Sequence, residues 1–143
     1  MESDSSGRGE TWRLSYPRYQ WNDVWARYDP TKLELYQTWT NEMLRHTELP
    51  PKYREYIIVA IDAIVAWPAP YIDGHIHEAF NQGATARELA EVIEVAGYIM
   101  GVHALNHGLT ALQRVVDERR ASNRPTPLDQ ADAQHTSQAD SDQ

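Results

Sequence analysis

Cysteine is the most informative absence from this 143-residue chain. Without it the protein has no disulfide, no thiolate metal site and no thiol nucleophile, so thiol-dependent peroxide reduction is excluded. Apolar runs of 18 residues are also absent, and we expect no membrane-spanning helix and no membrane partner. The polar N-terminus has no apolar segment of the kind that signal peptides carry, which makes a cytoplasmic location the expectation.

Basic residues are in the minority. The chain has 13 Lys and Arg against 21 Asp and Glu, for a formal net charge of −8. Nucleic-acid interfaces depend on clustered positive charge. We therefore expect no nucleic-acid partner.

Large apolar side chains are nearly absent from residues 1–10 and 120–143, and both ends are predicted to be disordered. The length between them suits a single helical domain over residues 11–119. Its first part, 11–30, is an aromatic arm with six rings: Trp12, Tyr16, Tyr19, Trp21, Trp25 and Tyr28. Such an arm favours packing against the domain or a neighbouring subunit, and the alternative is a wall for a flat substrate.

The spacing of apolar residues predicts a series of helices. After Pro30 they recur at three- and four-residue steps up to the break at 49–51, with Thr31 as the expected N-cap. Residues 52–67 are apolar nearly all round, which predicts a central buried helix. Pro68 and Pro70 are expected to stop it.

A shorter helix is predicted over 72–82, with Gly83 just beyond its C-terminal end. Thr85 and Glu88 form a T-x-x-E capping box that opens the longest predicted helix. Three glycines on this helix allow close packing or a kink: Gly97, Gly101 and Gly108. No strand pair is recognisable, so the predicted class is all-α.

Two carboxylates interrupt the predicted buried helix. Glu55 and Asp62 are seven residues apart and therefore share one helix face. Carboxylates in such surroundings must be paired, hydrogen-bonded, metal-bound or protonated. Either they form structural bridges, for example from Glu55 to an arginine, or they belong to a functional site.

Four of the six histidines lie within residues 75–107. His103 and His107 are four residues apart, which puts both rings on one helix face, as in helical zinc and iron sites. Together with His75 and a carboxylate they would suit a divalent metal. The alternative is that the rings are hydrogen-bonded core residues. His77, two residues from His75, is expected to point elsewhere.

Three segments resemble the carboxymuconolactone decarboxylase and alkyl hydroperoxidase D superfamily. They are LPPKYREYIIVA (49–60), HIHEAFNQGATARELAEV (75–92) and AGYIMG (96–101), within a family-like core over 49–112. The element from His75 to Leu89 is the most specific. The resemblance implies an alkyl hydroperoxidase D-like helical bundle whose subunits assemble into a trimer or hexamer, with sites near the subunit contacts.

The peroxidase branch of this superfamily carries a C-x-x-C-x-x-x-H motif and an upstream glutamate. Aligned on His75, the two thiol positions hold Pro68 and Tyr71, and Glu55 corresponds to the glutamate with an offset of one residue. The resemblance is therefore nearer to the decarboxylase branch, which acts on small carboxylated lactones without thiols. His103 and His107 lie outside that pattern.

These observations predict an enzyme that acts on a small organic acid, lactone or aromatic compound by histidine and carboxylate acid–base chemistry. The expected catalytic residues are His75, Glu55 and Tyr71. The expected ligands for a divalent Zn or Fe ion are His75, His103, His107 and Glu55. The alternatives are a non-enzymatic helical oligomer or accessory binding protein with structural histidines, and a member that lost its activity together with the thiols.

Overall fold

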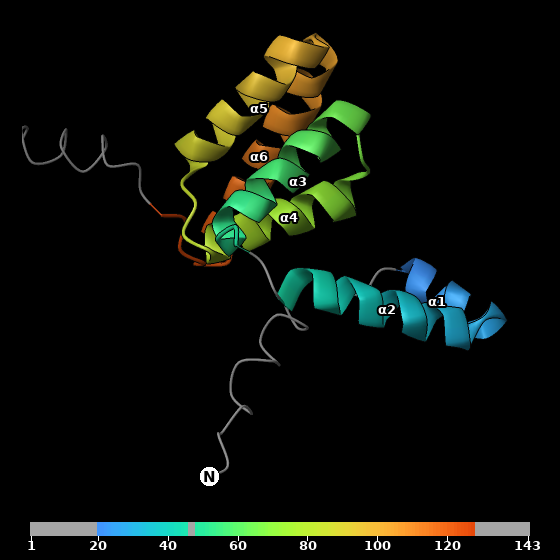
Figure 1. Cartoon of the computed structure of the whole chain (residues 1–143). Coiled ribbons are helices and arrows are strands. Elements are labelled where there is room, and N and C mark those ends of the chain that lie inside the picture. The colour runs from blue at the N-terminus through green and yellow to red at the C-terminus, as the bar shows by residue number, and fades with distance from the viewer. Residues whose placement is uncertain (1–19, 46–47, 128–143) are drawn as a thin grey trace, which may run out of the picture. The chain divides into compact units, whose positions relative to one another are not determined.

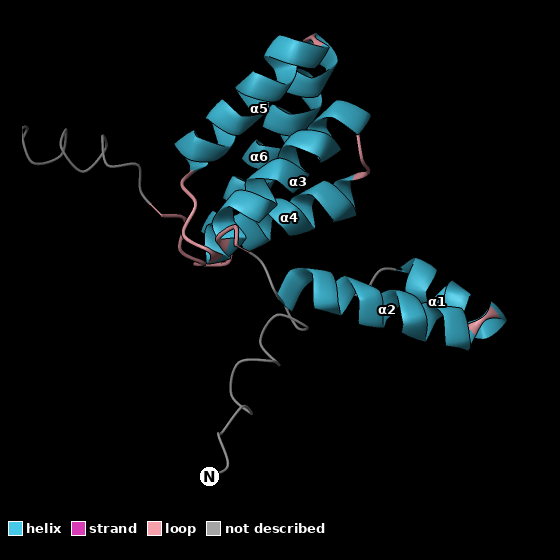
Figure 2. Ribbon diagram, in the orientation of Figure 1, coloured by secondary structure: helices cyan, strands magenta, loops and turns pink. Residues whose placement is uncertain are grey.

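The computed structural model describes residues 20–45 and 48–127, and within these ranges the chain is all-helical, as predicted (Figures 1 and 2). The helices are α1 (Gln20–Tyr28), α2 (Pro30–Arg45), α3 (Pro51–Val65), α4 (Ala69–Asn81), α5 (Ala86–Met100) and α6 (Val102–Ala121). The predicted disorder of 1–10 and the first three rings of the aromatic arm lie outside the described residues. None of the described helices combines the length and apolar character needed to cross a bilayer.

The chain divides into two compact units, one with α1 and α2 and the other with α3–α6. In the first unit, Tyr36 of α2 contacts two rings of the aromatic arm. Its ring centroid is 5.7 Å from that of Trp21 and 5.4 Å from that of Trp25. This part of the arm is therefore a helix that packs on α2.

The N-terminal cap of α2 differs from the prediction. Thr31 lies inside the helix, and Asp29 accepts a hydrogen bond from the backbone N–H of Lys32 at 3.0 Å. The reason is that Pro30 needs no N–H partner and fits the first helical position, which puts the cap at Asp29, two residues upstream of Thr31.

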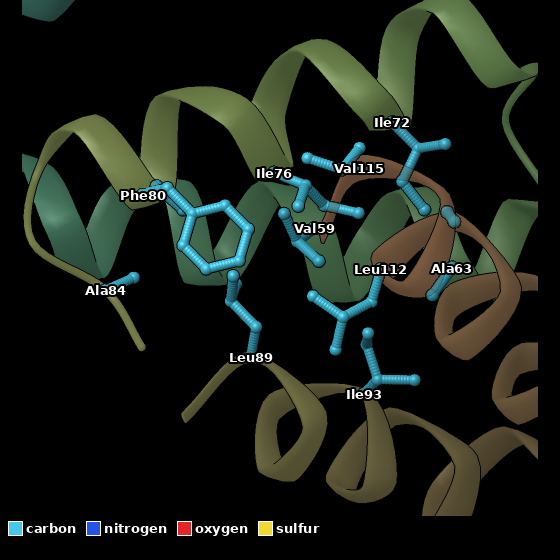
Figure 3. Close-up of a cluster of buried hydrophobic side chains, with 12 residues drawn as sticks. Val59, Ala63, Ile72, Ile76, Phe80, Ala84, Leu89, Ile93, Leu112 and Val115 are labelled. Carbon is cyan, nitrogen blue, oxygen red and sulfur yellow. The ribbon is translucent and has the colours of Figure 1, made fainter. Parts of the chain in front are cut away.

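The second unit consists of two helical hairpins, α3–α4 and α5–α6 (Figure 1). Helices α3 and α6 each contact the other three helices. Their shared core is aliphatic apart from Phe80, with the largest fully buried apolar side chains being Ile72, Ile76, Leu89, Ile93, Val59 and Val115 (Figure 3).

Of the residues predicted to begin or end helices around α4 and α5, Pro70 differs from the prediction, whereas Gly83 and the capping box agree with it. Pro70 does not stop a helix but lies in the first turn of α4, where a missing N–H costs nothing. Gly83 follows α4 with φ +87°, as predicted. The capping box is confirmed: Thr85 Oγ1 accepts from the N–H of Glu88 at 3.1 Å, and Glu88 Oε2 accepts from the N–H of Thr85 at 2.8 Å.

The predicted long helix after Thr85 is wrong, because the chain reverses at Gly101. This residue has φ +97°, in the left-handed region that glycine tolerates, and it separates α5 from α6. The apolar stripe therefore does not continue from Ile93 to His103 on one helix. Helix α6 itself extends to Ala121.

Helix α3 is not buried all round within one chain, contrary to the prediction. Its inner face carries the buried residues Glu55, Val59, Asp62 and Ala63. Its outer face carries large apolar residues at four-residue steps, each about half exposed: Tyr53 49%, Ile57 50%, Ile61 52% and Val65 54%. We call these four residues the α3 outer face.

Candidate functional site

A buried carboxylate and a histidine meet between α3 and α4. Glu55 has no exposed surface, and its Oε2 lies 3.0 Å from His75 Nδ1. Its other oxygen, Oε1, lies 3.7 Å from Arg54 Nε. These contacts supply the partners that a carboxylate in an apolar interior requires.

The contact with Glu55 determines which nitrogen of the His75 ring carries the proton. An ionised Glu55 can only accept, so His75 donates from Nδ1. The neutral ring then has its lone pair on Nε2, the atom that can take up a proton. Since the His75 side chain is 19% exposed while Glu55 is inaccessible, the ring connects the buried charge with the surface.

The packing of the buried face of α4 positions His75. Ile72, Ile76 and Ala79 are fully buried in the core and fix the rotation of this helix about its axis. His75 lies beside that face and turns towards α3. The pair therefore depends on the α3–α4 hairpin and on no flexible loop.

Two aromatic rings that precede His75 in the chain contact each other. Tyr71 is one turn earlier on α4 and half-buried, and its ring centroid is 5.5 Å from that of Trp67 in a T-shaped contact. Trp67 is 46% exposed. The two rings contact each other, and Tyr71 is the one that lies one turn from His75 on α4. Trp67 was not among the predicted site residues, because it lies before α4 and helical spacing does not indicate its contact with Tyr71.

His103 and His107 lie on α6 and contact backbone carbonyls at the end of the α3 region. His107 Nε2 lies 2.7 Å from the carbonyl oxygen of Trp67, and His103 Nε2 lies 3.3 Å from that of Ile64. A carbonyl only accepts, so both rings carry a proton on Nε2. His103 is exposed and His107 half-buried, because the break at Gly101 removes them from the core stripe.

The predicted metal ligands do not form a metal-binding group in this chain. Across residues 20–45 and 48–127 no three His, Asp or Glu side chains are arranged to hold a metal ion. Within the predicted set His75 and Glu55 are in contact, and His103 and His107 use Nε2 for carbonyls. We therefore derive no chemical step through a metal.

Asp62 also belongs to this neighbourhood. It is 8% exposed, and its Oδ2 has no hydrogen-bond partner in the described part of the chain. Burial raises the pKa of Asp62; the positive charge of protonated His75 acts against this, the charge of Glu55 adds to it, and protonated His107 acts against it. The spacing from Glu55 was visible in the sequence, but the missing partner was not.

His77 points away from the Glu55–His75 pair. Its Nε2 lies 3.2 Å from Glu118 Oε2 on α6. His77 Nδ1 lies 3.4 Å from Nη1 of the buried Arg119, which also donates to the carbonyl oxygen of Pro125. These contacts join α4 to the end of α6 and are structural.

Comparison with known proteins adds two findings. The sequence profile of the carboxymuconolactone decarboxylase family matches residues 30–114, more than half of the chain. A crystal structure of a provisionally named carboxymuconolactone decarboxylase from Burkholderia xenovorans LB400 is similar, with 28% sequence identity and a TM-score of 0.65. The similarity covers 76% of this chain and 86% of that chain. No curated protein sequence matches significantly.

Proposed function

The chain belongs to the carboxymuconolactone decarboxylase family, and we propose that it is an enzyme that acts on a small organic acid, lactone or aromatic compound. The observation that carries this proposal is the 3.0 Å contact between His75 Nδ1 and the fully buried Glu55. A buried carboxylate behind an imidazole is an arrangement that serves general acid–base catalysis.

In the proposed reaction His75 exchanges a proton with the substrate at Nε2. For a carboxylated lactone, the bond between carbon and carboxylate breaks, CO2 leaves, and the electron pair delocalises into the lactone carbonyl. Protonated His75 then donates its Nε2 proton to the substrate carbon and becomes neutral. Glu55 stabilises the imidazolium form and keeps the ring oriented through Nδ1.

Tyr71 and Trp67 would position the substrate. Their T-shaped rings offer an apolar surface that suits a flat ring better than an extended chain, and Tyr71 is one turn from His75 on α4. Tyr71 is thus proposed as a positioning residue, in place of a thiol, at the position where the peroxidase branch has its second cysteine.

We further propose that the active form is a homo-oligomer, a trimer or hexamer. The α3 outer face has a continuous row of half-exposed apolar side chains, and the α5–α6 corner exposes Tyr98 (87%) and Ile99 (68%). Contiguous apolar surfaces of this kind mark interaction sites. Light scattering should give a multiple of the 16.4 kDa chain mass, and a monomer at micromolar concentration would contradict the proposal.

A non-enzymatic binding or accessory protein is the second candidate. It is favoured by His103 and His107, whose bonds to the carbonyls of Ile64 and Trp67 are those of structural histidines. A substrate panel separates the two candidates. The purified wild-type protein is incubated with carboxymuconolactone and related carboxylated lactones, and CO2 release is measured. Turnover supports the enzyme, whereas binding without turnover across the panel supports the second candidate.

A further inference from the structure

The turn that joins α3 to α4 contains a strained residue, Ala66. Its φ is +53°, in the left-handed region where a side chain is unfavourable and glycine is usual. The N–H of the next residue, Trp67, bonds to the carbonyl oxygen of Asp62 at 2.9 Å, which is the bond that closes a Schellman motif at the end of α3. Strain of this kind persists where surrounding contacts hold one conformation, and it is frequent at functional sites.

Three constraints fix the backbone of Trp67 in this turn. Its N–H is bonded to α3, and Pro68 restricts it to an extended conformation. Its carbonyl oxygen accepts a hydrogen bond of 2.7 Å from His107 Nε2, which comes from a different helix, α6. Because the backbone is held on both sides of its Cα, the direction in which the indole leaves the chain is held as well.

The indole of Trp67 is a surface that a ligand can reach. Its residue is 46% exposed, and its ring centroid lies 5.5 Å from that of Tyr71 in a T-shaped contact. Tyr71 is tied to the same turn, since its N–H bonds to the carbonyl oxygen of Pro68 at 3.0 Å. A half-exposed indole beside a second ring offers a flat apolar contact to a cyclic ligand.

We propose that His107 is a positioning residue that determines the preference of this site for cyclic over open-chain acids. The inference rests on the proposed function, in which Trp67 and Tyr71 position the substrate. His107 acts through Trp67: its bond to the carbonyl oxygen holds the indole against Tyr71. A histidine with a merely structural role would stabilise the fold without changing which acid binds.

The first measurement needs no ligand. In NMR spectra of the full-length protein, the indole N–H signal of Trp67 is assigned by its absence from Trp67→Phe. We expect this signal to shift or broaden in His107→Ala and to keep its wild-type position in Glu118→Gln. This matched control weakens another contact between α6 and a histidine, His77 at 3.2 Å, about three turns further along the helix. An unchanged indole signal in His107→Ala would overturn the proposal.

The second measurement compares two monocarboxylates of equal charge, the cyclic benzoate and the open-chain hexanoate, by NMR titration. Wild type and Glu118→Gln should bind benzoate more tightly than hexanoate. His107→Ala should weaken benzoate binding by about threefold to tenfold, the loss of one aromatic contact, and leave hexanoate binding unchanged. His107→Gln keeps an N–H donor on its side chain and should restore most of the affinity for benzoate. Equal affinity of wild type for both acids, or equal weakening of both in His107→Ala, would overturn the proposal.

These measurements separate failure of this inference from failure of the proposed function, because neither measures turnover. A protein that shows the ring preference and its dependence on His107, but releases no CO2 from carboxylated lactones, supports the inference and contradicts the proposed reaction. Turnover by a protein whose ring preference does not depend on His107 supports the reaction and overturns the inference.

Discussion

Replacing Gly108 by Ala tests the close packing of α6 against α3 and α5. A Cβ at position 108 would lie 2.6 Å from Ile93 Cγ2 and 3.0 Å from the Cβ of Ala63. Carbon atoms do not approach to 2.6 Å, so Ile93 must change rotamer. The Cβ of Ala63 is fixed to the backbone of α3, and relief there requires α6 to move away.

Two terms of opposite sign determine the magnitude. Overpacking of a well-packed core costs about 1–3 kcal/mol. Alanine gains about 1 kcal/mol over glycine from helix propensity. We expect Gly108→Ala to lower the free energy of unfolding by about 1 kcal/mol, which corresponds to a loss of roughly 4–8 °C in Tm for a unit of this size.

Urea and thermal unfolding followed by circular dichroism measure this effect. Asn106→Ala is the control, because Asn106 is exposed on the same helix. It should leave stability unchanged or raise it by about 0.5 kcal/mol. If Gly108→Ala is as stable as Asn106→Ala or more stable, α6 and α3 do not pack as closely as described.

Three further predictions concern charge, hydrogen bonding and redox chemistry. Burial acts to raise the pKa of Glu88, but the N–H of Thr85 and the ammonium of Lys52 outweigh it and lower the pKa to about 2 from 4.5. The stability that Glu88 contributes should therefore be complete above pH 4.5 and be lost towards pH 2, so the Tm difference between wild type and Glu88→Gln should shrink over that range; a constant difference would contradict this. His107→Ala should lower the free energy of unfolding by about 1 kcal/mol through the lost bond to the carbonyl of Trp67, and an unchanged urea midpoint would refute that bond. Dithiol-dependent reduction of an alkyl hydroperoxide should stay at the protein-free rate, because the chain has no cysteine, and turnover above that rate would contradict this.

The parts of the fold that were predicted correctly depend on local chemistry. The capping box of Thr85 and Glu88 and the left-handed Gly83 involve residues within three positions of each other. These local interactions do not depend on how distant parts of the chain fold. The missed break at Gly101 shows the limit of periodicity, since apolar residues continue at helical spacing across a residue that reverses the chain.

The candidate site was predictable only where local sequence and family resemblance agreed. His75 and Glu55 were identified together, and their contact follows from the pairing of α3 with α4. The partners of His103 and His107 are backbone carbonyls, which no side-chain pattern reveals. For Asp62, the sequence shows the spacing from Glu55 but not the absence of a hydrogen-bond partner.

The proposal that the Glu55–His75 pair transfers the proton is tested most directly by kcat. The rate of CO2 release from the best carboxylated lactone is measured for wild type, His75→Gln and the matched control His77→Gln. We expect His75→Gln to lower kcat by about 10²–10⁴, the usual contribution of a positioned acid or base, and His77→Gln to keep the wild-type rate. A wild-type kcat in His75→Gln, or an equal loss in both variants, would contradict the account.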